Sequence, residues 1–298
     1  MTPAHPNRAL PAMDPSPAII GRIDEPVIVR RPETRKTPIL IASPHSGRTY
    51  PPDIIAQAAL PLPVLRRSED AYMDLLVEPG PGIGITTILA PFPRVFIDPN
   101  RSTRELDREL FADFSGDETG DTPHVQAGLG VVPRISADGR PIYTQPLDLA
   151  EARRRIATYY RPYHGAIEVE LQAACDVFGM GLLLDMHSMP AAAGGGIDAV
   201  LGDRHGTSCD PEIMARIEAA FRDAGLTVRR NQPYAGGYTT AFYGRPKDCR
   251  HAVQIEINRG LYLDETRVTR SGTFAALQTV LTTVLTDLAA VNWHENRL

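Results

Sequence analysis

Short apolar runs recur along the chain at even spacing and predict the strands of a sheet. The first run, PILIAS at residues 38–43, is continuous rather than alternating, as expected for a strand covered on both faces. Five further runs predict strands, at residues 85–89, 94–98, 181–185, 197–201 and 252–257. A hairpin is predicted at residues 131–144, with its turn at Asp138 and Gly139.

Segments with helical periodicity lie between these runs. One starts at Asp148 and runs to about Tyr160, and Pro162 breaks or restarts it as far as Phe178. Another is predicted to start with Asp210 as its N-cap residue. The last is a long amphipathic helix with apolar residues at three- and four-residue steps: Leu277, Val280, Leu281, Val284, Leu285 and Leu288.

No linker divides this series of elements. It therefore predicts a single α/β domain over residues 21–298, with a mixed, mostly parallel sheet between helical layers. A length of 298 residues would also accommodate two small domains, so the even spacing of the elements decides the count. The start of the chain is rich in Pro and Ala, and residues 1–20 are expected to be a disordered segment.

Composition narrows the classes of partner and of metal site. The net charge of −5 offers no overall counter-charge to a phosphate backbone, so nucleic-acid binding is not expected. The chain has no apolar run long enough for a signal peptide or a membrane span, which favours a cytoplasmic protein with no membrane partner. Three cysteines without a CxxC motif exclude a disulfide framework and a cysteine zinc site, so any metal must be held by His and carboxylates. The oligomeric state is not specified by these patterns.

Polar clusters follow four of the predicted strands. Their sequences are PHSG at 44–47, DPNR at 98–101, DMHS at 185–188 and EINR at 256–259. Sites in doubly wound sheets gather at the carboxyl ends of the strands, so these clusters are expected to converge on one crevice.

Two histidines in these clusters are the first candidates for a metal site. His45 and His187 each follow an apolar strand, and a catalytic zinc usually takes three protein ligands and leaves one position for water. A carboxylate would be the third ligand, and a further cluster at 68–74, SEDAYMD, supplies Asp70 or Glu69. Asp74 lies four residues after Asp70 and could face the same way on a helix. The alternative for each histidine is a capping or hydrogen-bonding role.

Charged side chains in the other clusters suggest acid–base chemistry and anion binding. Glu256 lies between two isoleucines, so it is either paired, for example with Arg259, or turned into a cavity. If it faces a metal-bound water, it can act as a general base. Arg94 and Arg101 flank the predicted strand at 94–98, and one could clamp a substrate carboxylate while the other polarises a carbonyl.

The segment 234–240, YAGGYTT, is a glycine-rich loop that contains Gly237 and Tyr238. It lacks the GxxxxGK[ST] order of a phosphate-binding loop. A loop that covers the substrate and a plain turn are the two interpretations. Neither a GxSxG elbow nor an HExxH motif occurs in the chain.

Taken together, these clusters resemble the N-formylglutamate amidohydrolase family, within the larger group that includes zinc carboxypeptidases and aspartoacylase. The resemblance covers roughly residues 38–290 and keeps the family's order. It rests on six motifs: SPHSGRTYP (43–51), SEDAYMDLL (68–76), RVFIDPNRS (94–102), LLDMHSMP (183–190), PYAGGYTTAFYG (233–244) and QIEINRGLY (254–262).

The resemblance implies a phosphorylase/hydrolase-like α/β fold, similar to zinc carboxypeptidases, with one zinc ion (Zn²⁺). His45 and His187 match the family's histidine ligands, and the carboxylate ligand falls in Glu69–Asp70, where we favour Asp70. Glu256 falls on the strand that supplies the general base.

The resemblance also assigns the substrate contacts. Asn100 and Arg101 match a pair that contacts the substrate carboxylate and carbonyl, and Arg94 lies close to the position of a carbonyl-polarising arginine. The loop with Gly237 and Tyr238 is expected to line the substrate pocket.

Two positions depart from the family's pattern. Pro99 stands before the Asn–Arg pair, where the usual residue is Leu, and it favours an extended conformation at Asp98. The acidic segment reads Glu-Asp-Ala, whereas many relatives have Asp followed by Trp, so the third ligand stays open between Glu69 and Asp70.

The predicted function is zinc-dependent hydrolysis of N-formyl-L-glutamate, a small anionic N-acyl amino acid, to formate and L-glutamate. One alternative keeps the chemistry and changes the substrate to another N-acyl amino acid or a small peptide. An alternative of a different class is a metal-free protein that binds a small ligand. A role in histidine degradation follows from the family's name alone.

Overall fold

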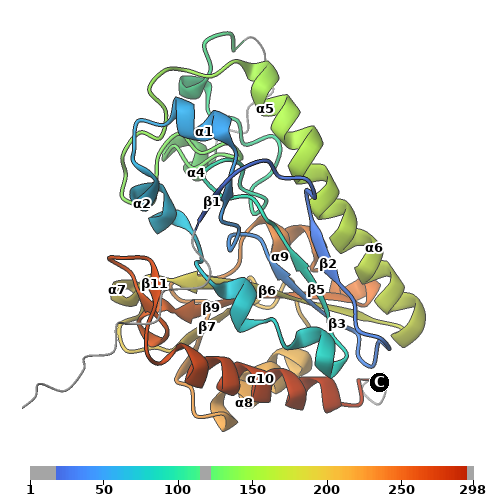
Figure 1. Cartoon of the computed structure of the whole chain (residues 1–298). Coiled ribbons are helices and arrows are strands. Elements are labelled where there is room, and N and C mark those ends of the chain that lie inside the picture. The colour runs from blue at the N-terminus through green and yellow to red at the C-terminus, as the bar shows by residue number, and fades with distance from the viewer. Residues whose placement is uncertain (1–17, 115–121, 294–298) are drawn as a thin grey trace, which may run out of the picture.

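A seven-stranded sheet divides the protein into two unequal halves (Figure 1). The computed structural model describes residues 18–114 and 122–293. In spatial order, the strands are β2 (Ile28–Arg30), β5 (Thr86–Leu89), β3 (Ile39–Ser43), β6 (Gly181–Met189), β9 (Arg250–Asn258), β7 (Ala199–Gly202) and β8 (Val228–Arg230).

Most neighbouring strands run in the same direction. The β5–β3, β3–β6, β6–β9 and β7–β8 pairs are parallel, whereas β2–β5 and β7–β9 are antiparallel. The predicted α/β fold, with a mixed and mostly parallel sheet between helical layers, is therefore confirmed.

Alternate residues of the central strands enter two different hydrophobic cores. In β3, Ile39 and Ile41 belong to one core, and Leu40 and Ala42 belong to the other. Helices and loops thus cover both faces, which is why this strand reads as a continuous apolar run rather than an alternating one.

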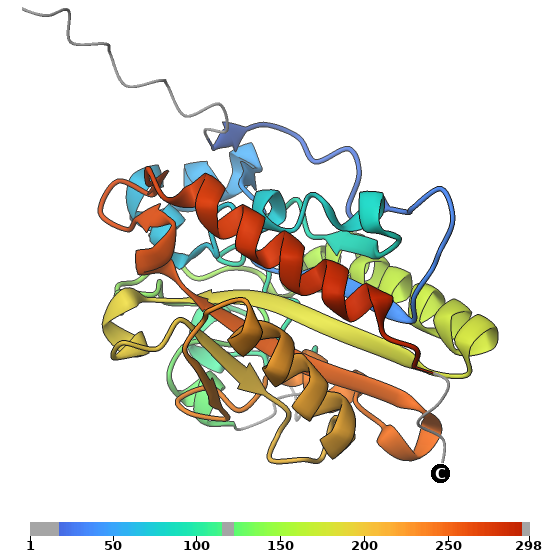
Figure 2. The same cartoon turned by 90° about the horizontal axis from the view of Figure 1, so that it is seen from below.

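One face of the sheet is covered by regular helices. Figure 2 shows α8 (Pro211–Asp223) and α10 (Phe274–Ala290) side by side across it, and the short helix α3 (Met73–Leu76) packs against α10. Asp210 accepts a hydrogen bond from the Glu212 N–H and caps α8, as predicted. The apolar stripe of α10 faces the sheet, with Val280 half-buried at its edge.

A long helix runs along the opposite face. It consists of α5 (Leu149–Arg155), a π-helical turn (Ile156–Tyr160) and α6 (Arg161–Phe178). In the π-turn, the Arg161 N–H donates to the Ile156 carbonyl, five residues earlier. Proline has no N–H and its ring clashes within an α-helical turn, so the wider turn lets the helix continue through Pro162 instead of breaking.

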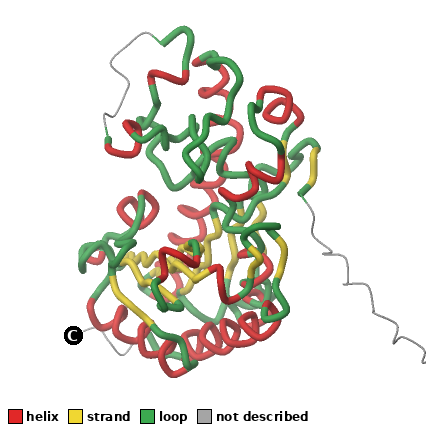
Figure 3. The backbone as a smooth tube through the Cα atoms, turned by 90° about the vertical axis from the view of Figure 1, so that its left-hand side faces the viewer, coloured by secondary structure: helices red, strands yellow, loops and turns green. Residues whose placement is uncertain are grey.

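Beyond this helix, the same half of the molecule is rich in loops (Figure 3). Its helices are short, and they are α1 (Pro52–Gln57), α2 (Leu62–Leu65), α4 (Pro123–Gln126) and α9 (Tyr238–Tyr243).

The prediction of a strand at 94–98 is wrong. The N–H groups of Phe96 and Ile97 both donate to the Pro93 carbonyl, which makes a turn, and the apolar side chains of this turn are buried in the loop-rich core. These residues are apolar because they are buried in a turn, and not because they form a strand.

The prediction of a hairpin at 131–144 is correct in its turn but wrong in its two strands. The turn at Asp138–Gly139 occurs, with φ of +76° at Gly139, but Ile135 and Pro141 form only a single isolated bridge. Pro133 and Pro141 lack the N–H groups that a ladder would need.

Other strands differ from prediction mainly in length. The predicted strand 181–185 continues to Met189 as β6, and so includes His187. The strands at 85–89, 197–201 and 252–257 shift by one or two residues at their ends.

Short elements complete the fold. They are α7 (Ala191–Gly194), β10 (Leu263–Asp264), which pairs with β11 (Thr269–Arg270), and β1 (Ile19–Ile20), which pairs with β4 (Thr49–Tyr50). The expected disordered segment at 1–20 falls largely on residues 1–17, which lie outside the described residues. Within the described ranges, every helix is too short or too polar to cross a bilayer.

Candidate metal centre

Neighbouring strands bring the two candidate histidines to the same edge of the sheet. His45 follows the end of β3 by two residues, and His187 lies near the end of β6, the parallel neighbour of β3. Asp70 lies in the loop before α3, and its N–H donates to the His45 carbonyl at 3.0 Å. That backbone hydrogen bond holds the loop against the strand end.

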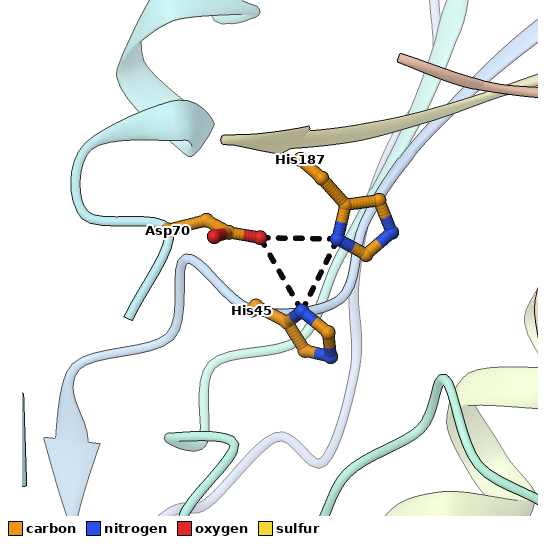
Figure 4. A group of neighbouring side chains, drawn as sticks. All are labelled: His45, Asp70 and His187. Atoms are coloured by element: carbon orange, nitrogen blue, oxygen red, sulfur yellow. Dashed lines mark hydrogen bonds and ion pairs between the residues drawn. The ribbon is translucent and has the colours of Figure 1, made fainter. Parts of the chain in front are cut away.

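The three side chains point toward one another (Figure 4). The Nδ1 atoms of His45 and His187 are 3.1 Å apart, and Asp70 Oδ2 lies 3.3 Å and 3.0 Å from them. A tetrahedral zinc ion with bonds of about 2.0–2.1 Å separates its ligand atoms by about 3.3 Å. All three residues are buried, with 1–3% of their surface exposed. The donor set thus fits a metal ion in both type and spacing.

The second nitrogen of each histidine contacts a buried carboxylate. His45 Nε2 lies 2.7 Å from Asp98 Oδ1, and His187 Nε2 lies 3.0 Å from Asp185 Oδ2. Neither Asp185 oxygen accepts a hydrogen bond from any other described group, so His187 is its charge partner. Metal-binding histidines usually donate their other N–H to such a group, which fixes the ring's orientation and tautomer.

The remaining oxygen of Asp70 is also held. Oδ1 accepts hydrogen bonds from Arg259 Nη2 at 3.0 Å and from Ser188 Oγ at 3.2 Å. Arg259 also donates to Ser188 Oγ at 3.0 Å. The suggested pairing of Glu256 with Arg259 is therefore not observed, because Arg259 pairs with Asp70.

The alternative carboxylates are bound elsewhere. Glu69 Oε1 accepts from Tyr50 Oη at 2.8 Å and from Arg66 Nε at 3.2 Å. Asp74 Oδ1 accepts from Arg48 Nη1 at 2.8 Å. Of the candidates in the 68–74 segment, Asp70 alone joins the two histidines in the group of potential ligands found among the described residues.

Charges within this cluster shift the pKa values of its members. Burial raises the pKa of Asp70, but hydrogen bonds to His187 and His45 outweigh burial and leave that pKa well below its usual value. Burial lowers the pKa of His187, yet the charge of Asp185 and a hydrogen bond to it leave the His187 pKa well above its usual value. Burial likewise disfavours the Asp98 carboxylate, but Arg94 and His45 hold the pKa of Asp98 low.

Glu256 lies beside the cluster on the neighbouring strand. It is directly opposite His187 in the β6–β9 register, and Oε1 accepts a hydrogen bond from Gln254 Nε2 at 2.7 Å. Burial raises the pKa of Glu256, the charge of His187 opposes that shift, and the charge of Asp70 reinforces it. The carboxylate is thus held near the cluster with an increased affinity for a proton.

The two candidate arginines differ in their surroundings. Arg94 Nη2 donates to Asp98 Oδ2 at 2.7 Å, and attraction to Asp98 and Asp70 raises the pKa of Arg94 against the effect of burial. Arg101 donates to two backbone carbonyls, those of Leu129 and Asn100, at 3.0 Å and 2.8 Å. Burial lowers the pKa of Arg101, although Asp98 opposes the shift.

The glycine-rich loop packs directly on Asn100. Asn100 Oδ1 accepts from the Thr239 N–H at 2.9 Å, and the Gly237 N–H donates to Gln254 Oε1 at 2.7 Å. A Cβ atom at Gly237 would lie 2.5 Å from Asn100 Nδ2, so only glycine allows this approach. Asn100 Nδ2 in turn lies 3.4 Å from His187 Nε2, which connects the loop to the cluster.

A cavity of about 500 Å³ lies between the Asn100 segment and this loop. Asn100 and Arg101 line one side, and Gly237 and Tyr238 line the other. The structure therefore brings together four of the residues predicted to bind substrate. Arg94 does not line this cavity and lies on the side of Asp98 instead.

Several side chains of the site make contacts that the sequence did not predict. Asp98, Asp185 and Arg259 orient the three potential ligands, and each belongs to a polar cluster that follows an apolar run, which was the available signal. His164 contacts the Pro99 carbonyl through Nε2 and Tyr243 Oη through Nδ1, both at 2.9 Å. Burial lowers the pKa of His164 to about 4.

Comparison with known proteins gives consistent matches over most of the chain. A family model described as N-formylglutamate amidohydrolase matches residues 37–263. An N-formylglutamate deformylase of Pseudomonas aeruginosa is 32% identical over 238 residues, which cover 77% of this chain and 84% of that protein. One from Pseudomonas putida is 30% identical over 242 residues, covering 78% and 84%.

A solved structure shares both sequence and fold. The N-formylglutamate amidohydrolase from Ralstonia eutropha JMP134 is 37% identical, with a TM-score of 0.84. The match covers 89% of this chain and 97% of that protein.

Proposed function

Because the chain belongs to the N-formylglutamate amidohydrolase family, we propose that it hydrolyses N-formyl-L-glutamate to formate and L-glutamate with one zinc ion. The names of the relatives support the substrate. The arrangement of the chain's own residues supports the chemistry, and one observation carries it: two histidine nitrogens and a carboxylate oxygen converge within 3.0–3.3 Å.

His45, Asp70 and His187 are the proposed metal ligands. Neutral imidazole and carboxylate suit zinc, and three protein ligands leave a position for water, as in catalytic zinc sites. Zinc, when bound, acts as a Lewis acid and lowers the pKa of a bound water toward about 7. Asp98 and Asp185 keep the imidazole nitrogens that face the centre free to bind the metal, because a carboxylate beside the other nitrogen favours the tautomer with its proton there.

Glu256 is the proposed general base and acid. Its carboxylate takes the proton of the attacking water, and the oxygen of that water bonds to the formyl carbon. The same carboxyl group then delivers the proton to the amide nitrogen, so that the carbon–nitrogen bond breaks and the amine leaves. A raised pKa suits this exchange, because it brings the carboxyl closer to the pH at which the enzyme works.

Cationic and amide side chains are proposed to bind the negatively charged groups of the substrate. Arg94, held by Asp98, is proposed to stabilise the negative charge that develops on the formyl oxygen. Asn100 and Arg101 are proposed to bind the carboxylate next to the scissile amide, with Gly237 and Tyr238 as the opposite wall. A few placed cations can bind an anion although the whole chain carries a net charge of −5.

The test combines metal analysis with parallel assays. We expect purified protein to contain about one zinc per chain, to lose activity with a chelator and to regain it on addition of zinc. N-formyl-L-glutamate, N-acetyl-L-aspartate and a dipeptide would be assayed side by side, and the first should be hydrolysed with the highest kcat/KM. A higher kcat/KM for N-acetyl-L-aspartate or for the dipeptide would show that N-formyl-L-glutamate is not the preferred substrate. Tight binding of N-formyl-L-glutamate without turnover, in protein loaded with zinc, would indicate a binding protein.

A cytoplasmic location and a role in histidine degradation follow from this proposal and are part of it. Measurement of the enzyme's activity in soluble cell fractions would check the location.

A further inference from the structure

One turn at the border of the cavity holds two consecutive non-glycine residues in the left-handed region. Arg204 has φ of +53° and His205 has φ of +56°. Side chains with a Cβ atom rarely adopt this conformation, because it brings Cβ close to the following carbonyl oxygen. Glycine would fit at position 204 without that cost, yet the chain has arginine there.

Side-chain hydrogen bonds hold this turn in place. Asn231 Oδ1 accepts from the N–H groups of Asp203 at 3.1 Å and His205 at 3.3 Å. Asp203 Oδ1 accepts from the Gly206 N–H at 3.1 Å and from Asn231 Nδ2 at 2.7 Å. These hydrogen bonds fix the backbone conformation at Arg204 in spite of its cost. Strained backbone of this kind persists at functional sites when surrounding contacts hold it.

The strained backbone places the Arg204 side chain on the outer side of the glycine-rich loop. A Cβ atom on Gly236 would lie 3.0 Å from Arg204 Cγ, so the side chain packs along the loop backbone. Arg204 lines the 500 Å³ cavity. The only hydrogen bond of its guanidinium within residues 18–114 and 122–293 is a long one, from Nη1 to the Gly236 carbonyl at 3.5 Å. No carboxylate of these residues pairs with it.

The inner side of the same loop touches the metal centre through Asn100. Gly237 packs on Asn100, and Asn100 lies against His187. Arg204 and Asn100 thus line one cavity from two sides of a loop that lacks side chains at Gly236 and Gly237. Asn100 contacts His187 of the cluster, whereas the Arg204 guanidinium contacts the Gly236 carbonyl.

We propose that Arg204 is a specificity-determining residue that binds the side-chain carboxylate of an N-formyl dicarboxylic amino acid. This inference rests on the proposed function and extends it to the second anionic group of the substrate. Asn100 and Arg101 hold the carboxylate beside the scissile amide, close to His187, and Arg204 takes the carboxylate that extends away from it.

The charge distribution of the cavity fits an added anion. Arg101, Arg104 and Arg204 all line it, and Glu105 is its one carboxylate among the described lining residues. That carboxylate is already used, because Oε2 accepts from the Ser102 N–H at 2.8 Å and Oε1 from Thr122 Oγ1 at 2.7 Å. The free hydrogen-bonding capacity of the Arg204 guanidinium is suited to a planar, bidentate carboxylate.

The experiment compares a dianionic substrate with its neutral-side-chain analogue. Zinc-loaded wild-type protein and the Arg204→Gln, Arg204→Lys and Arg204→Gly variants would be assayed on N-formyl-L-glutamate and N-formyl-L-glutamine. Arg229→Gln is the matched control, because Arg229 is an exposed arginine on β8 that does not line the cavity. Thermal unfolding would be measured for each protein.

We expect Arg204→Gln to raise KM for N-formyl-L-glutamate by about 10- to 100-fold, with kcat changed by less than about threefold, as for loss of a hydrogen bond to a charged group. KM for N-formyl-L-glutamine should change little, so the preference for glutamate shrinks by the same factor. Arg204→Lys should recover part of the preference. Arg204→Gly should lose selectivity while its unfolding midpoint stays equal or rises, a combination that a purely structural arginine would not produce.

An unchanged KM for N-formyl-L-glutamate in Arg204→Gln, or an equal rise for both substrates, would overturn the inference and leave the proposed function intact. Failure of the wild-type protein to hydrolyse N-formyl-L-glutamate would instead overturn the proposed function, and this inference with it.

Discussion

The metal centre and the arginine-lined cavity share Asn100 as a border but are built in opposite ways. In the centre, all three potential ligands are buried, and each has its remaining polar atom bound by another side chain. In the cavity, Arg204 is exposed, and its guanidinium makes a single, long hydrogen bond to the described part of the chain. Under the proposed function, the chemistry would depend on a prearranged network, and selectivity would depend on side chains that keep hydrogen bonds available.

The largest effects should come from the ligands themselves. We expect His187→Ala and Asp70→Ala to lose zinc affinity by more than the about 10- to 100-fold that follows removal of an outer partner, and activity with it. Zinc content after dialysis and turnover would be measured together. Asp74→Asn, four residues from Asp70 and paired with Arg48, is the matched control and should keep both. Full zinc occupancy in His187→Ala would show that His187 is not a ligand.

The next effect separates proton transfer from metal binding. Glu256→Gln keeps the size of the side chain and its contact with Gln254 but removes the base, so turnover should fall by at least about 100-fold. Zinc content should stay at the wild-type level, because Glu256 is not one of the three converging residues. Near-normal turnover in this variant would exclude Glu256 from the role of base.

A smaller effect is expected from the carboxylates behind the histidines. Asp185→Asn should weaken zinc binding by about 10- to 100-fold, because His187 loses the negative partner that orients its ring. A competition titration with a chelator of known affinity would measure the change. Asp98→Asn should behave similarly through His45, although Arg94 would then also lose its partner. Wild-type zinc affinity in both variants would mean that the centre does not need Asp98 and Asp185. The prearranged network would then no longer distinguish the centre from the cavity.

The smallest effect concerns a support of the cavity wall. His164 has a native pKa of about 4, so the unfolded chain binds a proton on it at a higher pH than the folded protein does. Its contribution to the free energy of unfolding is present above about pH 6.5 and should decrease as pH falls, by about 2 kcal/mol between pH 7.5 and pH 5. His164→Gln removes this titration.

Urea unfolding of wild type and His164→Gln at the two pH values would test the support. Other titratable groups also contribute to the pH dependence of stability, so the difference between the two proteins is the informative quantity. A difference that does not change with pH would contradict the assigned pKa of His164.

The two sides of the sheet also differ in how well the sequence predicts their structure. β3, α8 and α10 were predicted because they pack as regular elements, in which the period of the apolar positions reports the buried face directly. The apolar residues at 94–98 are equally buried, but they lie in a turn after Pro93. In the loop-rich half, tertiary packing determines the backbone conformation, and the local sequence pattern therefore does not predict it.

The three residues that converge were predicted as candidate ligands for a related reason. His45 and His187 are polar residues that follow apolar strand sequences, and parallel neighbours end at one edge of a sheet. The role proposed for Arg204 had no such signal, because it depends on a left-handed turn fixed by Asn231 and on two glycines 32 and 33 positions further along. Contacts of that kind exist only after the chain has folded.

Both histidines present Nδ1, rather than Nε2, to the centre. The imidazole ring is rigid, so only two rotatable bonds separate it from the main chain, and Nδ1 is the ring nitrogen nearer to the main chain. The spacing of the donors is therefore inherited from the hydrogen-bonded register of β3 and β6 more than from side-chain adjustment. A shift of one of these strands by one residue would turn its side chains to the opposite face and dismantle the centre, even with every residue type unchanged.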